Sequence, residues 1–138
     1  MNEDFVSFVL AKKLKEKGFR EKCLCYYNDD NIEYNYDSLV FNHEMYISHN
    51  SYDNIWHRDN YDAPTISQVL KWLREEKGYH IEFIGNACGY LFIVSDIPSK
   101  GGTDRYCSDY SGPNDGGTWD TYEEAALAGI EYVLDNLI

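Results

Sequence analysis

Three helices are marked at their ends in the sequence, and these marks constrain the fold more than any other feature. The first predicted helix is acidic where it begins and rich in lysine where it ends, and Gly18 follows as a left-handed stop. The second and third begin with capping sequences at Thr65 and Thr121, and the second ends at Lys77-Gly78. The helices expected from these marks cover about residues 3–17, residues 65–77, and a third stretch from Thr121 nearly to the C-terminus.

Apolar spacing predicts which helical residues pack in the core. In the first helix the stripe comprises Phe5, Val6, Val9, Leu10 and Leu14. In the third helix, small residues surround Gly129, which costs up to ~1 kcal/mol relative to alanine in a helix interior. We therefore expect one turn of that helix to lie close to a sheet.

The segments between the helices have the composition of strands and turns. The order is thus α-β-β-(β)-α-β-β-β-α, and hairpins favour antiparallel pairing. We predict an α+β fold, with a mainly antiparallel sheet of about 5–6 strands and three helices, in a single domain over residues 1–138. The expected strands are 22–27, 32–36, 39–47, 79–84, 90–97 and 105–110, with 49–63 as a long loop and 90–97 as a central strand.

Charge and hydropathy exclude several classes of function. The formal net charge is −12, and residues 23–64 carry one cation against eight acidic residues. Such a field repels a phosphate backbone, so we expect no nucleic-acid partner. No apolar run approaches the ~20 residues of a membrane span, and the acidic start, Met1 to Asp4, does not resemble an export signal. We therefore expect a cytoplasmic protein that does not enter membranes.

Sequence motifs give no support for metal or catalytic chemistry. The four cysteines, Cys23, Cys25, Cys88 and Cys107, have no CxxC spacing, and without an export signal we expect buried thiols rather than disulfides. His57-Arg58-Asp59-Asn60 is similar to a kinase catalytic loop, but the rest of the kinase motif set is missing. The sequence therefore predicts a non-enzymatic protein without metal or cofactor.

Aromatic and acidic residues gather in the segment 23–64, and this pattern indicates a protein-binding surface. The chain has thirteen tyrosines, seven of them in this segment together with Trp56. Aromatic residues are enriched at protein interfaces, and acidic residues among them favour a basic partner. The other interpretation is that the tyrosines lie on strands, with their rings buried and their hydroxyls in contact with solvent. The predicted binding residues are Asp53, Trp56, Asp59, Tyr61 and Asp62.

Three helical segments together resemble a family of short uncharacterised bacterial proteins that phages and other mobile elements often carry. They are Ala11–Phe19, Ala63–Glu76 and Tyr122–Leu134, under half of the chain. The resemblance implies no activity. The C-terminal half is also similar to HicB-like antitoxins, although no DNA-binding segment follows its last helix. We therefore predict a small non-enzymatic protein-binding or accessory protein, and the resemblance implies that a mobile element carries it. The alternatives are an acidic mimic of nucleic acid that inhibits a DNA-binding enzyme, an antitoxin-like protein, and an enzyme with an unrecognised site.

Overall fold

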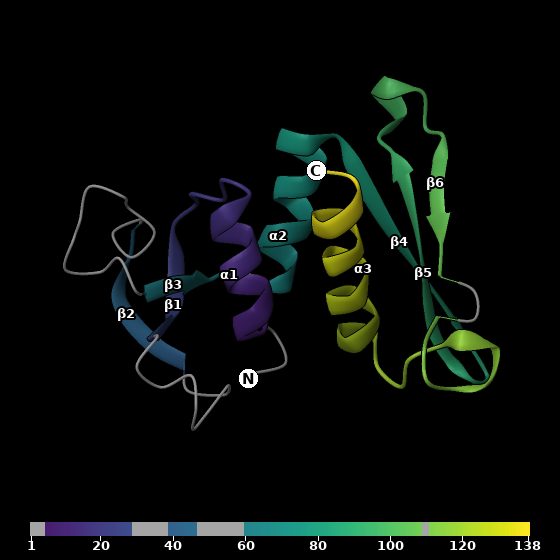
Figure 1. The fold of residues 1–138 in the computed structure, drawn as a ribbon, viewed down its shortest axis with the longest axis horizontal. Coiled ribbons are helices and arrows are strands. Elements are labelled where there is room, and N and C mark those ends of the chain that lie inside the picture. Colours follow the sequence, from purple (N-terminus) through teal and green to yellow (C-terminus); the bar gives the residue numbers. More distant parts are fainter. Residues whose placement is uncertain (1–4, 29–38, 47–59, 109–110) are drawn as a thin grey trace. The chain divides into compact units, whose positions relative to one another are not determined.

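The computed structural model describes residues 5–28, 39–46, 60–108 and 111–138 (Figure 1). The chain divides into two compact units, Met1–Thr65 and Ile66–Ile138, and each contains one three-stranded antiparallel sheet. The predicted α+β class and order of elements are confirmed, with the six strands shared between two sheets. That residues 1–138 form a single domain stays a prediction.

The first helix, α1 (Phe8–Glu16), begins later than predicted because Ser7 caps it. The Ser7 hydroxyl accepts a hydrogen bond from the backbone N–H of Leu10 at 3.3 Å. This shift changes the buried face: Phe8, Leu10, Ala11 and Leu14 are buried, whereas Val9, predicted to be in the core, is 47% exposed. The predicted stop is confirmed, since Gly18 has φ +89° and the N–H of Phe19 donates to the Leu14 carbonyl at 2.9 Å.

The sheet of the first unit has the order β2-β1-β3, so β1 is its central strand. The prediction of a loop over 49–63 is wrong for its last four residues, which form β3 against β1. The sequence Asn-Tyr-Asp-Ala carries no strand signal of its own, and pairing with β1 supplies the backbone hydrogen bonds. The predicted strand 32–36 lies outside the described residues. The strands are β1 (Cys23–Asn28), β2 (Leu39–Tyr46) and β3 (Asn60–Ala63).

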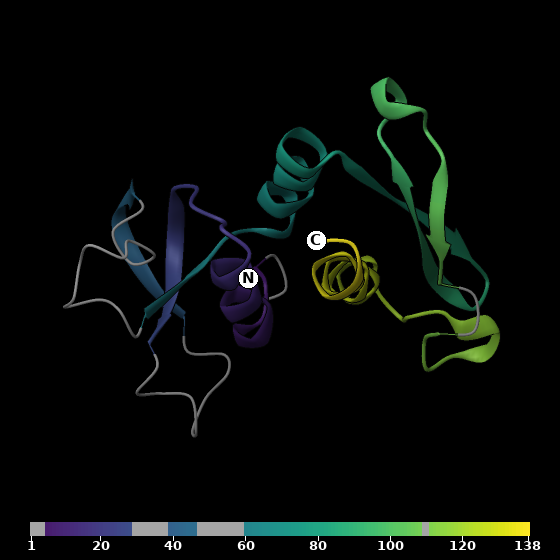
Figure 2. The same ribbon diagram turned by 45° about the horizontal axis from the view of Figure 1, so that its top comes forward.

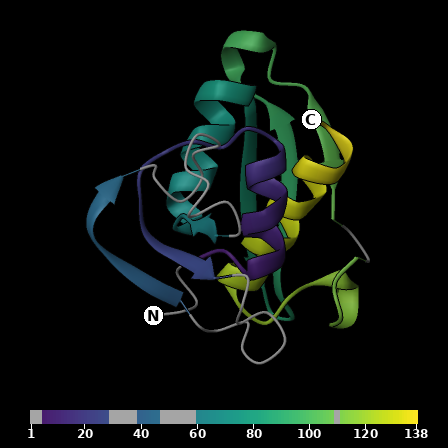
Figure 3. The ribbon, with the colours of Figure 1, turned by 60° about the vertical axis from the view of Figure 1, so that its left-hand side comes forward.

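Aromatic side chains join α1 to this sheet, and α1 contacts β3. Figure 3 shows α1 next to the arrow of β1. The Phe8 ring meets the rings of Tyr27 and Tyr61 edge-on, with centroids 5.7 Å and 5.3 Å away. The Tyr27 hydroxyl donates to the carbonyl of Val6 at 2.8 Å in the interior. Tyr27 therefore buries its ring and satisfies its polar atom within the unit.

The second unit contains two helices and the sheet β4-β5-β6. Helices α2 and α3 contact one another, and α3 contacts β4 and β5 (Figure 2). The predicted cap of α3 is confirmed: the Thr121 hydroxyl accepts the N–H of Glu124 at 3.1 Å. The elements are α2 (Ile66–Trp72) with a π-helical turn η5 (Leu73–Lys77), β4 (Tyr79–Asn86), β5 (Gly89–Asp96), η6 (Pro98–Lys100), β6 (Asp104–Cys107), η7 (Asp115–Gly117) and α3 (Tyr122–Asn136).

Strand β5 is the central strand of this sheet, as predicted, and its register orients the core. Phe92 and Val94 are buried, whereas Leu91 and Ile93 on the opposite face are only half-buried. The expected close approach of α3 is also confirmed. A Cβ on Gly129 would lie 3.3 Å from atoms of Ile81 and Phe92, so this glycine lets the helix backbone come down onto the sheet.

Among the helices that the structure describes, none is long and apolar enough to cross a membrane.

Candidate functional site

The predicted binding residues of the first unit do not assemble into a described surface. Asp53, Trp56 and Asp59 lie outside the described residues. Tyr61 pairs with Tyr27 across β3 and β1, and the Lys15 ammonium lies 4.8 Å from the centre of its ring. Asp62 is completely buried, which corrects its expected place in a surface loop: it lies on β3 opposite Tyr26.

Buried thiols accompany Asp62 in this sheet. Cys23 and Cys25 are completely buried on β1, as expected, but Cys88 and Cys107 are exposed, which corrects the expectation for those two. Burial raises the pKa of Cys25 from 9.0 to about 11. Burial, and secondarily the charge of Asp62, raise the pKa of Cys23 further. Protonated thiols of this kind are poor nucleophiles, so they belong to the core.

The second unit offers a better candidate site, which begins with the inner face of its sheet. Phe83 of β4 pairs with Phe92 of β5, and Val94 pairs with Tyr106 of β6. These side chains share the face toward α3. Phe92 is held in place by Ser108: its N–H donates to the buried Ser108 hydroxyl at 2.8 Å, and its carbonyl accepts the Ser108 N–H at 2.9 Å. These bonds anchor the backbone of Phe92, whose ring lies on this face.

A glycine-rich loop brings Trp119 to the same face. The N–H and carbonyl of Trp119 exchange hydrogen bonds of 2.9 Å and 2.8 Å with Tyr90 of β5. The buried Thr118 hydroxyl donates to the carbonyl of Cys88 at 2.9 Å, which ties the loop to the β4–β5 turn. Gly112 lies so close to the backbone of residues 117 and 118 that a Cβ there would overlap it. These contacts make the loop one wall of a cavity.

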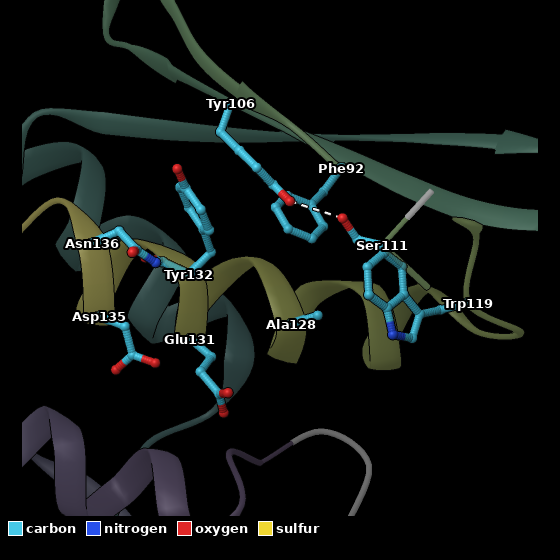
Figure 4. Close-up of a pocket in the computed structure, with 9 residues that line it drawn as sticks. All are labelled: Phe92, Tyr106, Ser111, Trp119, Ala128, Glu131, Tyr132, Asp135 and Asn136. Carbon is cyan, nitrogen blue, oxygen red and sulfur yellow. Dashed lines mark hydrogen bonds between the residues drawn. The ribbon is translucent and has the colours of Figure 1, made fainter. Parts of the chain in front are cut away.

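The aromatic cavity lies between α3, the sheet and this loop, and has a volume of about 240 Å³ (Figure 4). The rings of Tyr106 and Tyr132 stack, with centroids 3.8 Å apart and planes at 17°. Phe92 packs beside Tyr106 at 5.8 Å and beside Trp119 at 5.5 Å. The Tyr106 and Ser111 hydroxyls are hydrogen-bonded at 2.8 Å. The lining residues are Phe92, Tyr106, Ser111, Trp119, Ala128, Glu131, Tyr132, Asp135 and Asn136.

Two acidic residues lie at the rim of this cavity. Glu131 and Asp135 are exposed on α3 at its rim, and Figure 4 shows their carboxylates directed away from the rings. The second unit as a whole carries five cations against twelve acidic residues. A cation approaching the cavity would therefore meet a favourable field before it reached the aromatic faces.

The lining residues offer groups for recognition. Their chemistry comprises aromatic faces, three hydroxyls, one amide and two carboxylates, with no histidine, cysteine or basic residue among them. Within the described ranges, no three histidine, cysteine or acidic side chains come together as ligands for a metal ion.

The aromatic cavity was missed at the level of sequence because its residues come from β5, β6, a loop and α3. The one local signal is on α3, where Ala128 and Tyr132 are four residues apart and therefore share a helix face. A small residue followed by a large aromatic one on the same face leaves room beside the ring.

Comparisons of the chain with protein-family models, curated proteins and solved structures found no match. The resemblance to short proteins of mobile elements therefore stays a prediction.

Proposed function

We propose that this chain is a small non-enzymatic binding protein whose aromatic cavity receives a cationic side chain, arginine or lysine, from a basic protein partner. The observation that carries the proposal is the stacked pair Tyr106–Tyr132 beside Phe92 and Trp119, open to solvent next to Glu131 and Asp135. Arginine and lysine lay their apolar stems along aromatic faces and keep their charged ends near carboxylates.

The size of the cavity supports a side chain rather than a whole small-molecule ligand. Its volume of about 240 Å³ is below the roughly 300–1,000 Å³ typical of drug-sized ligands. A guanidinium or ammonium group with its methylene stem is a smaller object. Cation–π contacts contribute about 0.5–2 kcal/mol, so one side chain gives specificity while the rest of the partner supplies affinity.

The test uses two peptides that differ only in charge, acetyl-Gly-Arg-Gly-amide and its citrulline counterpart, titrated into ¹⁵N-labelled protein. Citrulline keeps the shape of arginine and loses the charge. We expect the arginine peptide to shift the amide resonances around Trp119 and Tyr132, and to bind roughly 2- to 30-fold more tightly than the citrulline peptide.

Two variants and one control localise the effect. Ala128→Leu extends a larger side chain from the cavity lining and should abolish the shifts for both peptides. The double variant E131Q/D135N should weaken only the arginine peptide, whereas E75Q/E76Q removes the same charge from exposed residues of η5 and should change binding much less. Equal binding of the two peptides would refute the cationic ligand, and unchanged binding to the Ala128→Leu variant would refute the cavity as the site.

A further inference from the structure

The two edges of the sheet in the second unit differ in how they are protected. The β6 edge has four residues, a bulge opposite Val94 and Ser95, and an ion pair of 3.0 Å between Arg105 and Asp96. Short length, bulges and charges are the features by which proteins prevent an edge from pairing. Strand β4 has eight residues in regular register with β5, no proline and no lysine, and a single acidic residue, Glu82. Its edge is thus unprotected.

The hydrogen bonds of β5 reveal which peptide groups of β4 face this edge. The N–H and carbonyl of Phe92 bond to Ser108, and those of Tyr90 bond to Trp119, both on the side of β5 away from β4. Their partners on β4, Phe83 and Gly85, therefore form non-hydrogen-bonded pairs with β5. The peptide groups of Phe83 and Gly85 point outward from the edge, and the structure's described residues include no other strand beside β4.

Large apolar side chains are exposed around the same edge. Of the five large hydrophobic residues that are exposed in the described chain, three lie here: Ile84 at 39%, Tyr90 at 36% and Tyr122 at 40%. Tyr122 packs on Phe83 with ring centroids 4.5 Å apart, and its ring also meets that of Tyr90. Tyr90 and Tyr122 lie on the same face as Phe83, and Ile84 lies on the opposite face of β4. Apolar side chains are therefore exposed on both faces beside the unpaired edge, as they are where strands pair between molecules.

We propose that β4 pairs antiparallel with β4 of a second copy of this chain, which makes a six-stranded sheet across a two-fold axis at Phe83. In a continuous sheet the two-fold axis is perpendicular to the sheet, so the same face of both copies lies on the same side of the combined sheet. Because side chains alternate, each residue must then pair with one of the same face, so the axis passes through a residue. At Phe83 the outward N–H and carbonyl bond reciprocally to those of Phe83 in the second copy.

The charge of Glu82 favours the register with the axis at Phe83 over the one with the axis at Glu82. The midpoint of β4 lies between Glu82 and Phe83, so an axis at either residue pairs the largest number of β4 residues between the two copies. An axis at Glu82 would place two carboxylates directly opposite each other, which destabilises a cross-strand pair. With the axis at Phe83, Glu82 lies opposite Ile84 of the second copy, and Ile81 lies opposite Gly85. The register thus avoids like charges along the strand.

The register predicts opposite effects for two substitutions at one exposed position. Ile84→Lys places an ammonium opposite Glu82 of the second copy at two symmetric sites, and should tighten the dimer roughly 2- to 30-fold. Ile84→Glu places two carboxylates opposite each other, and should weaken the dimer by a similar factor. The matched controls are Leu24→Lys and Leu24→Glu, at an exposed residue of β1 in the other unit.

Sedimentation equilibrium of the full chain, with circular dichroism to confirm folding, measures the dissociation constant of each variant. We expect a wild-type dimer that tightens with salt, because each copy carries a net charge of −12, and Ile84 variants that differ in opposite directions beyond the changes seen at Leu24. A monomeric wild type would overturn the proposal, including the case in which β4 instead pairs with a strand of another protein. A wild-type dimer whose Ile84 variants change together, or no more than the Leu24 variants, would overturn it as well.

Discussion

Gly129 provides a direct test of how tightly α3 packs on the sheet. A Cβ at this position would lie 3.3 Å from Cγ2 of Ile81 and from two ring atoms of Phe92, slightly closer than ordinary van der Waals contact. Gly129→Ala gains about 1 kcal/mol of helix propensity and requires only a small displacement of these neighbours. We therefore expect the free energy of unfolding of this variant to stay within about 1 kcal/mol of the wild type.

Gly129→Leu should be less stable than Gly129→Ala, although leucine and alanine have nearly equal helix propensities. Its three additional carbon atoms must enter the space that Ile81 and Phe92 occupy, and overpacking of this kind costs about 1–3 kcal/mol. The difference between the leucine and alanine variants therefore reports the sheet contact, with propensity nearly cancelled. Because Phe92 is also the floor of the aromatic cavity, the leucine variant should weaken peptide binding as well.

Urea unfolding followed by circular dichroism measures both variants, and Glu131→Ala with Glu131→Leu is the control pair at an exposed position of the same helix. The control pair should differ by less than about 0.5 kcal/mol. A Gly129→Leu variant as stable as Gly129→Ala would show that α3 does not pack on Ile81 and Phe92 at this distance, and the reasoning would fail.

Two other predictions concern buried polar groups. Ser108→Ala removes the acceptor of the Phe92 N–H, so it should lower the free energy of unfolding by about 1–3 kcal/mol and speed hydrogen exchange at Phe92. The control Ser99→Ala, at an exposed residue, should change the free energy of unfolding by less than about 0.5 kcal/mol. Equal losses in the two variants would contradict this account. The pKa values of Cys23 and Cys25 are raised in the folded state, so their contribution to stability is complete below about pH 8. The contribution of Cys25 is lost as the pH rises from 9.0 through about 11, and that of Cys23 is lost at higher pH. The wild type should therefore lose more stability over that pH range than the double variant Cys23→Ala, Cys25→Ala. In the native protein only Cys88 and Cys107 should react with a thiol reagent. Rapid labelling of all four cysteines would contradict the burial of Cys23 and Cys25.

Local chemistry determined much of this fold from the sequence alone. Thr121 caps α3 and Gly18 stops α1 through hydrogen bonds to residues within one turn, so neighbouring residues suffice to predict them. The order of helices and strands follows from the same local signals. The later start of α1 has an equally local cause in Ser7, and the acidic residues Glu3 and Asp4 outweighed that signal in the prediction.

Only the tertiary structure decided the features that depend on distant partners. Residues 60–63 became a strand because β1 offered hydrogen bonds, and Asp62 was thereby carried into the interior. Trp119 reaches the aromatic cavity because its backbone pairs with Tyr90, and Tyr106 meets Tyr132 because β6 pairs with β5, which α3 contacts. Contacts of this kind join residues far apart in the chain, and a sequence records each partner separately without recording the pairing. The helices could therefore be predicted from the sequence, whereas the aromatic cavity and the unprotected edge of β4 exist only once the sheets have formed.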